Sequence, residues 1–427
     1  MNIAKSSKKR VVIVGGGFAG IACAKALRKS GLQVVLIDRH NYHTFQPLLY
    51  QVATGGLEPD SISFPLRKLI QDYPDFYFRI GNLEHVDQNN KTIHTNIGDL
   101  AYDYLVLAVG SKTNFFGNKQ IQAESMAMKT VPQSLNLRSL ILESFEAALL
   151  TKDMDKRHGL MNFVLVGGGP TGVELAGALA EMKKAILPKD YPDLDIRNMK
   201  INLIQGAPRL LDAMSDKSSK AAEAYLKKLG VDVWTSTIVT DYDGWEVKTN
   251  TGHNFHSGTV IWSAGVQAQK ISGLDQIQER TNRVKTNTFC QVVDQKEIFA
   301  LGDYAAMESL AYPKGHPMMA QPALQQGKLT GENIIRMEKG LSLKPFKYKD
   351  KGSMATIGRN KAVVDLPRIH FQGILAWLVW MFIHLISLVG FRNKLVVFTN
   401  WLYNYFVFDR ETRLIIRPYK NKKVNPF

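Results

Sequence analysis

A glycine-rich strand-and-turn segment occurs twice in this chain, and this repeat restricts the fold more than any other feature. Residues 11–20 read VVIVGGGFAG and residues 163–172 read FVLVGGGPTG. In both copies a continuous apolar run precedes the glycines and an alanine-rich stretch follows them, which is typical of a buried parallel strand and a helix. Strands that alternate with helices predict right-handed crossovers and a doubly wound α/β fold. Two copies predict two Rossmann-like dinucleotide-binding domains.

The first glycine cluster has the spacing that dinucleotide binding requires. Gly15, Gly17 and Gly20 stand where glycine permits the turn, the approach of backbone to a pyrophosphate, and close packing of helix on strand. The N-terminus of the next helix offers N–H groups to the phosphates. The following apolar run ends at Asp38, where a carboxylate can accept hydrogen bonds from ribose hydroxyls.

The second cluster repeats these glycines but lacks the acid. Its next strand, residues 201–204, ends in Gln205. A glutamine can bond ribose hydroxyls, but it has no charge to repel a ribose phosphate, so NADPH is less strongly excluded than usual. Two dinucleotide sites in one chain suit a permanently bound flavin and a diffusing nicotinamide, with a hydride passing between stacked rings. In the second cluster, Gly167, Gly169 and Gly172 stand where Gly15, Gly17 and Gly20 stand in the first.

Composition excludes several classes of protein. The chain has 427 residues, of which 45% are apolar and 22% charged, so it is neither mostly disordered nor a polytopic membrane protein. Lys and Arg outnumber Asp and Glu by 54 to 38, and this surplus favours an acidic partner such as anionic lipid or nucleic acid. Cys23 and Cys290 lie far apart and form no redox pair. The basic N-terminus leads directly into a strand, so we expect a cytoplasmic protein without a secretory signal. We also expect no metal site.

Further segments resemble the two-dinucleotide-binding-domain flavoproteins of the glutathione-reductase-like fold. Residues 105–110 (LVLAVG) and 260–265 (VIWSAG) resemble its paired strand-to-turn segments, and residues 298–303 (IFALGD) resemble its late GD motif. In that family the Asp of this motif bonds the ribityl chain of the flavin. The resemblance implies non-covalent FAD at Gly15, Gly17, Phe18, Ala19, Gly20, Asp38, Arg39, Gln46, Pro47, Ala108, Gly110, Gly302, Asp303 and Ala320. It implies NADH binding at Gly167, Gly169, Pro170, Thr171, Gly172, Glu174, Gln205, Ala264 and Gly265.

Within this fold the chain most resembles the type II NADH:quinone oxidoreductases. Residues 42–53 (YHTFQPLLYQVA) resemble the family's flavin and quinone loop, and residues 320–327 (AQPALQQG) resemble its quinone motif. The resemblance implies oxidation of NADH through FAD and reduction of a membrane quinone without ion pumping, at the cytoplasmic face of the inner (plasma) membrane. Disulfide reductases and sulfide:quinone reductases of this fold use cysteines beside the flavin; without such a relay, electrons must leave the flavin directly. Departures from the family pattern are Val109, where Thr is usual, and Gln205.

The resemblance also implies individual roles. Glu174 would orient the nicotinamide, although an acid near a helix N-terminus also interacts favourably with the helix dipole. Gln321 and Gln325 would meet the quinone carbonyls, because neutral amides can donate to them, or would be ordinary capping amides. Lys361 is either near the flavin or quinone mouth or a solvated lysine. The predicted catalytic residues are thus Glu174, Gln321 and Gln325, and the predicted quinone site is Gln46, Pro47, Leu48, Gln321 and Gln325.

The C-terminal region combines apolar, aromatic and basic residues. Residues 372–391 contain no Asp, Glu, Lys or Arg, and a second amphipathic segment follows, with Asn393, Asn400 and Asn404 on one helical face. Two interfacial helices, one membrane span, or a helix pair buried in a soluble dimer all fit this pattern, and we expect interfacial docking. Each basic group near an anionic surface contributes roughly 1 kcal/mol. The basic residues from there to the end are Arg392, Lys394, Arg410, Arg413, Arg417, Lys420, Lys422 and Lys423.

The sequence therefore predicts three regions. An FAD-binding domain comprises residues 1–113 and 280–340, an NAD(P)H-binding domain comprises residues 114–279, and a membrane-docking region comprises residues 341–427. Two rival functions remain: a soluble NAD(P)H-dependent flavoprotein that reduces an iron–sulfur protein, and a nicotinamide-binding redox sensor that binds nucleic acid. Basic residues beside tryptophan-rich apolar helices suit lipid better than a duplex, so no nucleic-acid partner is expected. A homodimer is compatible with the sequence.

Overall fold

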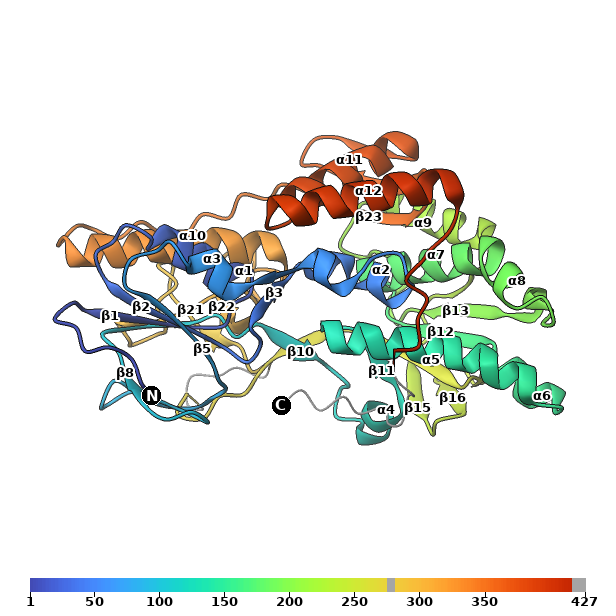
Figure 1. The fold of residues 1–427 in the computed structure, drawn as a ribbon, viewed down its shortest axis with the longest axis horizontal. Helices are drawn as coiled ribbons and strands as arrows, with labels where there is room; N and C mark the ends of the chain where they lie inside the picture. Colours follow the sequence, from blue (N-terminus) through green and yellow to red (C-terminus); the bar gives the residue numbers. More distant parts are fainter. Residues whose placement is uncertain (275–280, 417–427) are drawn as a thin grey trace.

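Two five-stranded parallel sheets form the body of the protein (Figure 1). We describe residues 1–274 and 281–416 of a computed structural model. The first sheet has the order β21 (Ile298–Ala300), β9 (Tyr104–Leu107), β1 (Arg10–Val14), β2 (Gln33–Asp38), β5 (Phe76–Ile80). The second has the order β11 (Met126–Ala127), β18 (Thr259–Trp262), β12 (Asn162–Val166), β13 (Lys200–Ile204), β14 (Asp232–Trp234). The predicted doubly wound α/β fold with two Rossmann-like sheets is confirmed.

Both glycine repeats form the predicted strand, turn and helix. Strands β1 and β12 are buried on both faces because each has sheet neighbours on two sides and helices above and below. Helix α1 (Phe18–Ala26) follows β1, and α7 (Pro170–Ala185) follows β12. Helix α10 (Ala320–Glu338) packs on α1, where a side chain at Gly327 would collide with the Ala19 carbonyl. Small residues thus bring the two helices into close contact.

Smaller sheets and helices complete the two halves of the molecule. The antiparallel pair β10 (Ser111–Thr113) and β19 (Val266–Ala268) lies between the two parallel sheets (Figure 1). Other strands are β3 (Tyr42–Thr44), β4 (Ser63–Pro65), β6 (Leu83–Asp87), β7 (Thr92–Thr95), β8 (Leu100–Ala101), β15 (Val239–Tyr242), β16 (Glu246–Thr249), β17 (Phe255–His256), β20 (Val284–Lys285) and β22 (Ala305–Ala306). Other helices are α2 (Leu49–Ala53), α3 (Leu66–Ile70), α4 (Lys119–Glu124), α5 (Val131–Leu150), α6 (Met154–Leu160), α8 (Leu187–Asp190) and α9 (Asp216–Lys228).

The C-terminal region is a small sheet followed by two helices. Strands β23 (Ser353–Gly358), β24 (Lys361–Asp365) and β25 (His370–Gln372) are antiparallel, and α11 (Ile374–Ser387) and α12 (Phe391–Val407) follow them. Figure 1 shows both helices on one side of the molecule, above α2 and α7.

The apolar stretch predicted over residues 372–391 is shorter as a helix than its composition suggests. Gly373 and Gly390 have φ angles of 85° and 87°, which favour glycine; Gly373 precedes α11, which ends at Ser387, and Gly390 precedes α12. Among the described residues, none of the helices is both long and apolar enough to pass through a bilayer.

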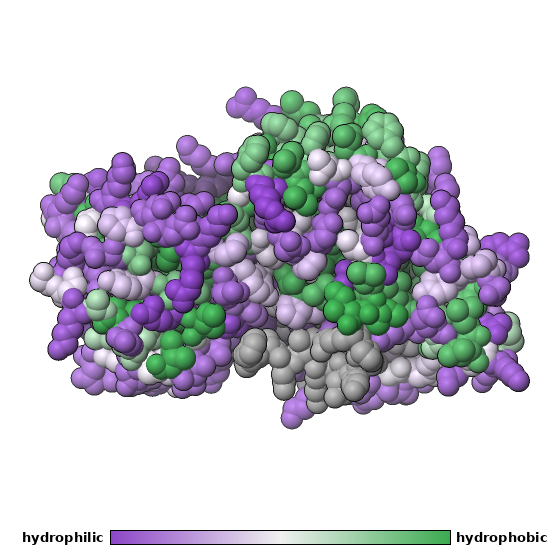
Figure 2. Space-filling model, viewed as in Figure 1, coloured by the Kyte–Doolittle hydropathy of each residue, from purple (hydrophilic) through white to green (hydrophobic). Residues whose placement is uncertain are grey.

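The asparagine face of α12 contacts protein. Asn393 Nδ2 donates to the Ser63 carbonyl at 2.8 Å, and Asn400 Nδ2 donates to Glu58 Oε2 at 2.7 Å. The opposite face is apolar and exposed, with Phe391 82% and Phe406 72% accessible. Figure 2 shows apolar side chains gathered over α11 and α12. We call this surface the apolar face; its members are Ile374, Leu375, Leu378, Phe382, Ile383, Ile386, Phe391, Leu395, Phe398, Leu402 and Phe406.

Two of the basic residues assigned to a lipid surface from sequence instead bind the protein. Arg410 pairs with Glu181, and Arg413 pairs with Asp190. That part of the prediction is wrong for these two residues, because both guanidinium groups find carboxylates on the second half of the molecule. Arg417, Lys420, Lys422 and Lys423 lie outside the described residues.

Candidate functional site

The two glycine loops are held in the same way. Gly16 N donates to Asp38 Oδ2 at 2.6 Å, and Gly168 N donates to Gln205 Oε1 at 2.8 Å. Each acceptor lies at or just beyond the end of the second strand of its repeat. Gln205 therefore holds the second loop through the same kind of hydrogen bond that Asp38 makes to the first loop, but its side chain is neutral.

The loops have the shape that a pyrophosphate requires. Gly17 and Gly169 are the N-caps of α1 and α7, and a Cβ built on either would meet no atom within 4 Å. The space in front of the helix N–H groups is thus open for phosphate oxygens. A Cβ on Gly15 would strike the Ala108 carbonyl, and one on Gly167 would lie 2.7 Å from Ala264 N. Each loop therefore packs against the strand-to-turn segment predicted to border its nucleotide.

Other residues predicted to bind FAD gather around the first loop. Gly302 and Asp303 form a short helical turn that begins beyond β21, and Ala320 starts α10. Ser111 Oγ donates to Asp303 Oδ2 at 2.5 Å, and Lys129 Nζ lies 3.8 Å from the same oxygen. Arg39 is half-buried, as Asp38 is, and Gly110 follows the end of β9. This set of open glycines, a strand-end acid and a second carboxylate fits a dinucleotide such as FAD.

A cavity of about 420 Å³ lies between α7 and the C-terminal helices. Aromatic side chains from α2, α11 and α12 form part of its wall, and charged side chains, among them Glu181, Lys361 and Arg410, form another part. Its other lining residues include Tyr50, Gln51, Glu174, Thr356, Trp377, Trp380, Met381, Trp401 and Tyr405.

Glu174 is a buried carboxyl group in this wall, 7% exposed. Burial raises its pKa to about 8; the backbone N–H of Thr356, 3.4 Å from Oε1, and the indole of Trp380 oppose this shift by favouring the carboxylate. The Trp380 N–H lies near Glu174 but makes no contact with full hydrogen-bond geometry among the described residues. Near neutral pH the Glu174 carboxyl thus holds a proton that it can give up.

Tyr50 offers a second donor. Gln51 Nε2 donates to Tyr50 Oη at 2.8 Å, which leaves the hydroxyl hydrogen free to donate elsewhere. Burial and the nearby Glu174 raise the pKa of Tyr50, so the phenol stays protonated. Gln51 Oε1 in turn accepts from Trp401 Nε1 at 2.8 Å. The cavity therefore presents hydrogen-bond donors within aromatic walls, a combination that suits a ring carrying carbonyl oxygens.

Comparisons with known proteins agree with this arrangement. Residues 9–327 match a family described as pyridine nucleotide-disulphide oxidoreductase, and residues 351–411 match the NDH2 C-terminal domain. A type II NADH:quinone oxidoreductase of Mycobacterium tuberculosis is 35% identical over 411 residues, which cover 92% of this chain and 87% of that protein. The chain belongs to the type II NADH:quinone oxidoreductase family.

A second relative supports this assignment, and solved structures share the fold. A Haemophilus influenzae type II NADH:quinone oxidoreductase is 30% identical and covers 84% of this chain and 87% of its own length. The structure of NDH2 from Plasmodium falciparum in complex with NADH superposes with a TM-score of 0.89 at 21% identity, over 96% of this chain and all of that one. The sulfide:quinone oxidoreductase of Aquifex aeolicus shares the fold with a TM-score of 0.72 at 22% identity, covering 93% and 95%.

The glutamines of the family's quinone motif bond to backbone in this structure. Gln321 Nε2 donates to the Gly352 carbonyl at 2.8 Å, and its Oε1 accepts from Lys351 N at 3.1 Å. Gln325 bonds Lys349 in the same two-point manner. Both amides thus hold residues 349–352 beside α10. Contact with quinone carbonyls, predicted from the family motif, would require them to exchange these bonds.

The remaining predicted residues differ in exposure. In the quinone loop, Gln46 is exposed, Pro47 is half-buried and Leu48 is fully buried, so Leu48 contributes packing. Phe18 lies edge-on to Phe45, and Ala19 is buried against α10. At the second loop, Pro170 and Thr171 are exposed at the start of α7, and Gly172 is buried beneath them. Gly265 is exposed beside Ala264.

The sequence reasoning missed three residues that contact the first glycine loop or the turn that carries Asp303. Gln326 is buried, and its Oε1 accepts from Gly302 N at 2.7 Å, so it fixes the turn that carries Asp303. His43 is buried and bonds the Gly16 carbonyl through Nδ1 at 3.1 Å. Lys129 adds a positive charge near Asp303. The only available signal was that Gln326 and His43 lie inside the two family motifs.

Both cysteines are structural. Cys23 and Cys290 are buried in the core beneath the first sheet, and burial raises the pKa of both thiols. A protonated, buried thiol is a poor nucleophile and redox partner. This agrees with the expectation that no cysteine relay operates here.

Proposed function

We propose that this chain oxidises NADH through FAD bound at the first glycine loop and reduces a membrane quinone without ion pumping. The observation that carries the proposal is the position of the cavity. It lies between α7, which begins at the second glycine loop, and α11 and α12, which expose the apolar face. One wall of the site thus comes from a helix that begins at a nucleotide loop, and another comes from helices that expose a surface suited to lipid.

The nucleotide loops would supply binding and orientation. Gly17 and Gly169 leave open space for the two pyrophosphates, and Asp38 and Gln205 fix the loops from the strand ends. When bound, FAD would supply the two-electron chemistry that no side chain provides. NADH is the expected donor, and the neutral Gln205 leaves NADPH as a weaker alternative.

Groups in the cavity would assist quinone reduction. The protonated Glu174 and the Tyr50 hydroxyl can donate to ring oxygens that become negative as electrons arrive. Trp380 adds an indole N–H that is not fully engaged by the described residues. These donors support a role for Glu174 on the quinone side in addition to its proposed contact with the nicotinamide. Gln46 and Pro47, in the loop expected to border the flavin, would shape the path between the flavin ring and the quinone ring.

The apolar face would attach the protein to the cytoplasmic side of the inner membrane. Its large side chains project from α11 and α12, and the asparagine face fixes α12 to the protein. Near the start of α12, Arg392 is exposed and its Nη1 lies 3.9 Å from Asp60 Oδ2, and Lys394 Nζ donates to the Ile386 carbonyl at 2.8 Å. Both cations lie beside the apolar face and would meet anionic headgroups there. This arrangement supports a peripheral, interfacial position.

An anaerobic absorbance experiment tests the redox proposal. The purified protein should show a flavin band, NADH should bleach it, and a quinone should restore it. Heat should release FAD, identifiable by mass. A colourless protein, or a flavin that NADH reduces but quinones fail to reoxidise, would contradict the proposal. Flotation with anionic liposomes, compared with DNA retention at equal salt, separates membrane docking from the nucleic-acid alternative.

A further inference from the structure

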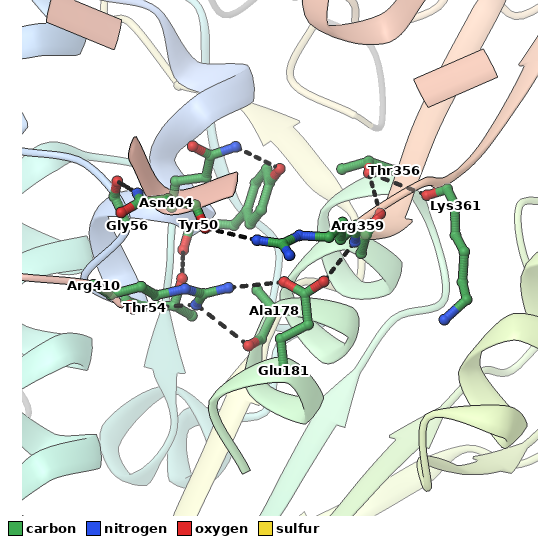
Figure 3. A network of polar contacts seen from close by, with 12 residues as sticks. Tyr50, Thr54, Gly56, Ala178, Glu181, Thr356, Arg359, Lys361, Asn404 and Arg410 are labelled. Carbon is green, nitrogen blue, oxygen red and sulfur yellow. Dashed lines mark hydrogen bonds and ion pairs between the residues drawn. The ribbon is translucent and has the colours of Figure 1, made fainter. Parts of the chain in front are cut away.

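The chain turns back into the protein after α12. Phe408 has a φ angle of 58°, a left-handed conformation that reverses the backbone. The guanidinium carbon of Arg359, at the start of the β23–β24 turn, lies 3.3 Å from the centre of the Phe408 ring. Arg359 also donates to the Asn404 carbonyl at 2.7 Å. These contacts fix the reversal, and the next residues direct Arg410 inward (Figure 3).

The Arg410 guanidinium joins two helices. Nη1 donates to the carbonyl of Thr54 at 3.2 Å and to that of Ala178 at 3.3 Å, and Nη2 donates to Glu181 Oε2 at 3.0 Å. Thr54 caps the C-terminus of α2, whereas Ala178 and Glu181 belong to α7. Burial lowers the pKa of Arg410 and the Glu181 carboxylate opposes that shift, but an arginine stays charged. A planar guanidinium fork that is bonded at both ends fixes direction as well as distance.

These two helices carry the two halves of the proposed redox site. Helix α2 directly follows residues 46–48, which are expected to border the flavin, and α7 begins at the second glycine loop. Thr54 lies one turn beyond Tyr50, and Ala178 lies one turn beyond Glu174. The guanidinium therefore links the end of α2 to α7 one turn away from Tyr50 and Glu174, and it lines the same cavity as these two donors.

We infer that Arg410 is a positioning residue that sets the spacing between α2 and α7 for hydride transfer. This inference rests on the proposed function. It gives the C-terminal segment a task at the redox site that is separate from membrane attachment. Hydride transfer depends steeply on geometry, and a misplacement of about 1 Å can cost about 100-fold in rate.

Arg413 provides a matched control on the same segment. Its Nε lies 2.7 Å from Asp190 Oδ2, and it also pairs with Asp409. Asp190 is on α8. Arg413 also donates to the Arg410 carbonyl and its side chain lies beside Gly55, but none of its hydrogen bonds among the described residues reaches α2 or α7. Helices α2 and α7 also pack directly on each other through apolar side chains. Loss of Arg413 loosens the segment, whereas loss of Arg410 removes the polar link that fixes how these two packed helices are spaced.

The test compares Arg410→Ala, Arg410→Lys and Arg413→Gln in anaerobic stopped flow. We expect Arg410→Ala to lower the limiting rate of flavin reduction by NADH by about 10- to 100-fold. The dissociation constant of NADH from the same titration should not change, because the glycine loop is intact. Arg410→Lys should be intermediate, since one ammonium replaces the fork less well. Millimolar guanidinium should partly restore Arg410→Ala, and Arg413→Gln should match the wild type.

Three results would overturn the inference. Arg410→Ala could reduce its flavin at the wild-type rate, or Arg413→Gln could slow reduction equally, which would assign the effect to segment attachment. If Arg410→Ala fails to fold, a folded Arg410→Lys that reduces its flavin at the wild-type rate would also contradict the inference. A wild-type flavin that NADH does not reduce would instead refute the proposed function, whatever the variants do.

Discussion

At the scale of single residues, one polar side chain in each half of the chain holds a glycine loop. Asp38 and Gln205 accept the N–H of Gly16 and Gly168, respectively. The sequence placed both residues at strand ends near a ribose, because the strand-end position follows from the fingerprint. It did not predict that they would also bond the loops, because that contact depends on how each loop folds back over its sheet.

Gln205 provides a test of nucleotide selectivity. In Gln205→Glu the new carboxylate can still accept from Gly168 N, but it would repel a ribose phosphate. We expect kcat/KM for NADPH to fall by about tenfold, while kcat/KM for NADH stays near the wild-type value. Steady-state kinetics with both nucleotides measure this. Equal losses with both would show that the substitution damages the loop.

Glu174 makes the stability of the protein depend on pH. Its pKa is about 8 in the folded protein against an ordinary value of 4.5. Between these values the unfolded chain binds fewer protons than the folded one, so the free energy of unfolding falls as pH rises, by up to about 1.4 kcal/mol per pH unit. Glu174→Gln removes this titration.

We therefore expect the stability of Glu174→Gln relative to wild type to increase from about pH 5 to about pH 8. Urea unfolding of both proteins at several pH values measures the difference. A difference that is constant with pH would mean that Glu174 is ionised in the folded protein.

At the scale of elements, the C-terminal helices combine predictable and unpredictable features. Composition predicted two amphipathic helices, and both exist. The single-face arrangement of Asn393, Asn400 and Asn404 was also visible in the periodicity, but its partner was not. A sequence pattern shows that a helix has two unlike faces; only the packed structure shows which one meets protein.

The apolar face should bind membranes through its large side chains. Phe398 and Phe406 are exposed on α12, and replacing both with Glu would place charge at a lipid surface. We expect the Phe398→Glu/Phe406→Glu variant to bind anionic liposomes at least about tenfold more weakly in flotation. Leu150→Glu is the control, because Leu150 is 86% exposed at the end of α5, away from this face. Equal flotation of all three proteins would exclude the apolar face as the docking surface.

Gln321 of α10 can be tested for two roles: the quinone contact that the family motif implies, and the backbone hydrogen bonds that the structure shows. Gln321→Leu removes two hydrogen bonds to residues 351–352 and should lower the free energy of unfolding by about 1–3 kcal/mol. Lys328→Gln, an exposed change on the same helix, should have little effect. Urea unfolding checks this. Unchanged stability with slower quinone reduction would instead favour the direct quinone contact implied by the motif.

At the scale of the whole molecule, the fold follows from the repeat, but the way its parts connect does not. Two glycine fingerprints and the later strand-to-turn segments were enough to predict two parallel sheets. The return of the chain at residues 409–413 was not predictable, because Arg410 and Arg413 read as part of a basic tail. Their carboxylate partners, Glu181 and Asp190, are more than two hundred residues away in sequence. Local composition carries no information about such contacts.

The most direct test of the account uses a quinone confined to a bilayer. Purified protein is mixed with NADH and with anionic vesicles that contain a long-chain quinone, and NADH oxidation and quinol formation are followed together. We predict equal molar amounts of both products, formed at a lower rate by the Phe398→Glu/Phe406→Glu variant than by the wild type. NADH oxidation with a soluble acceptor but no quinol in the vesicles would contradict the proposal that this chain links a nucleotide site to the membrane.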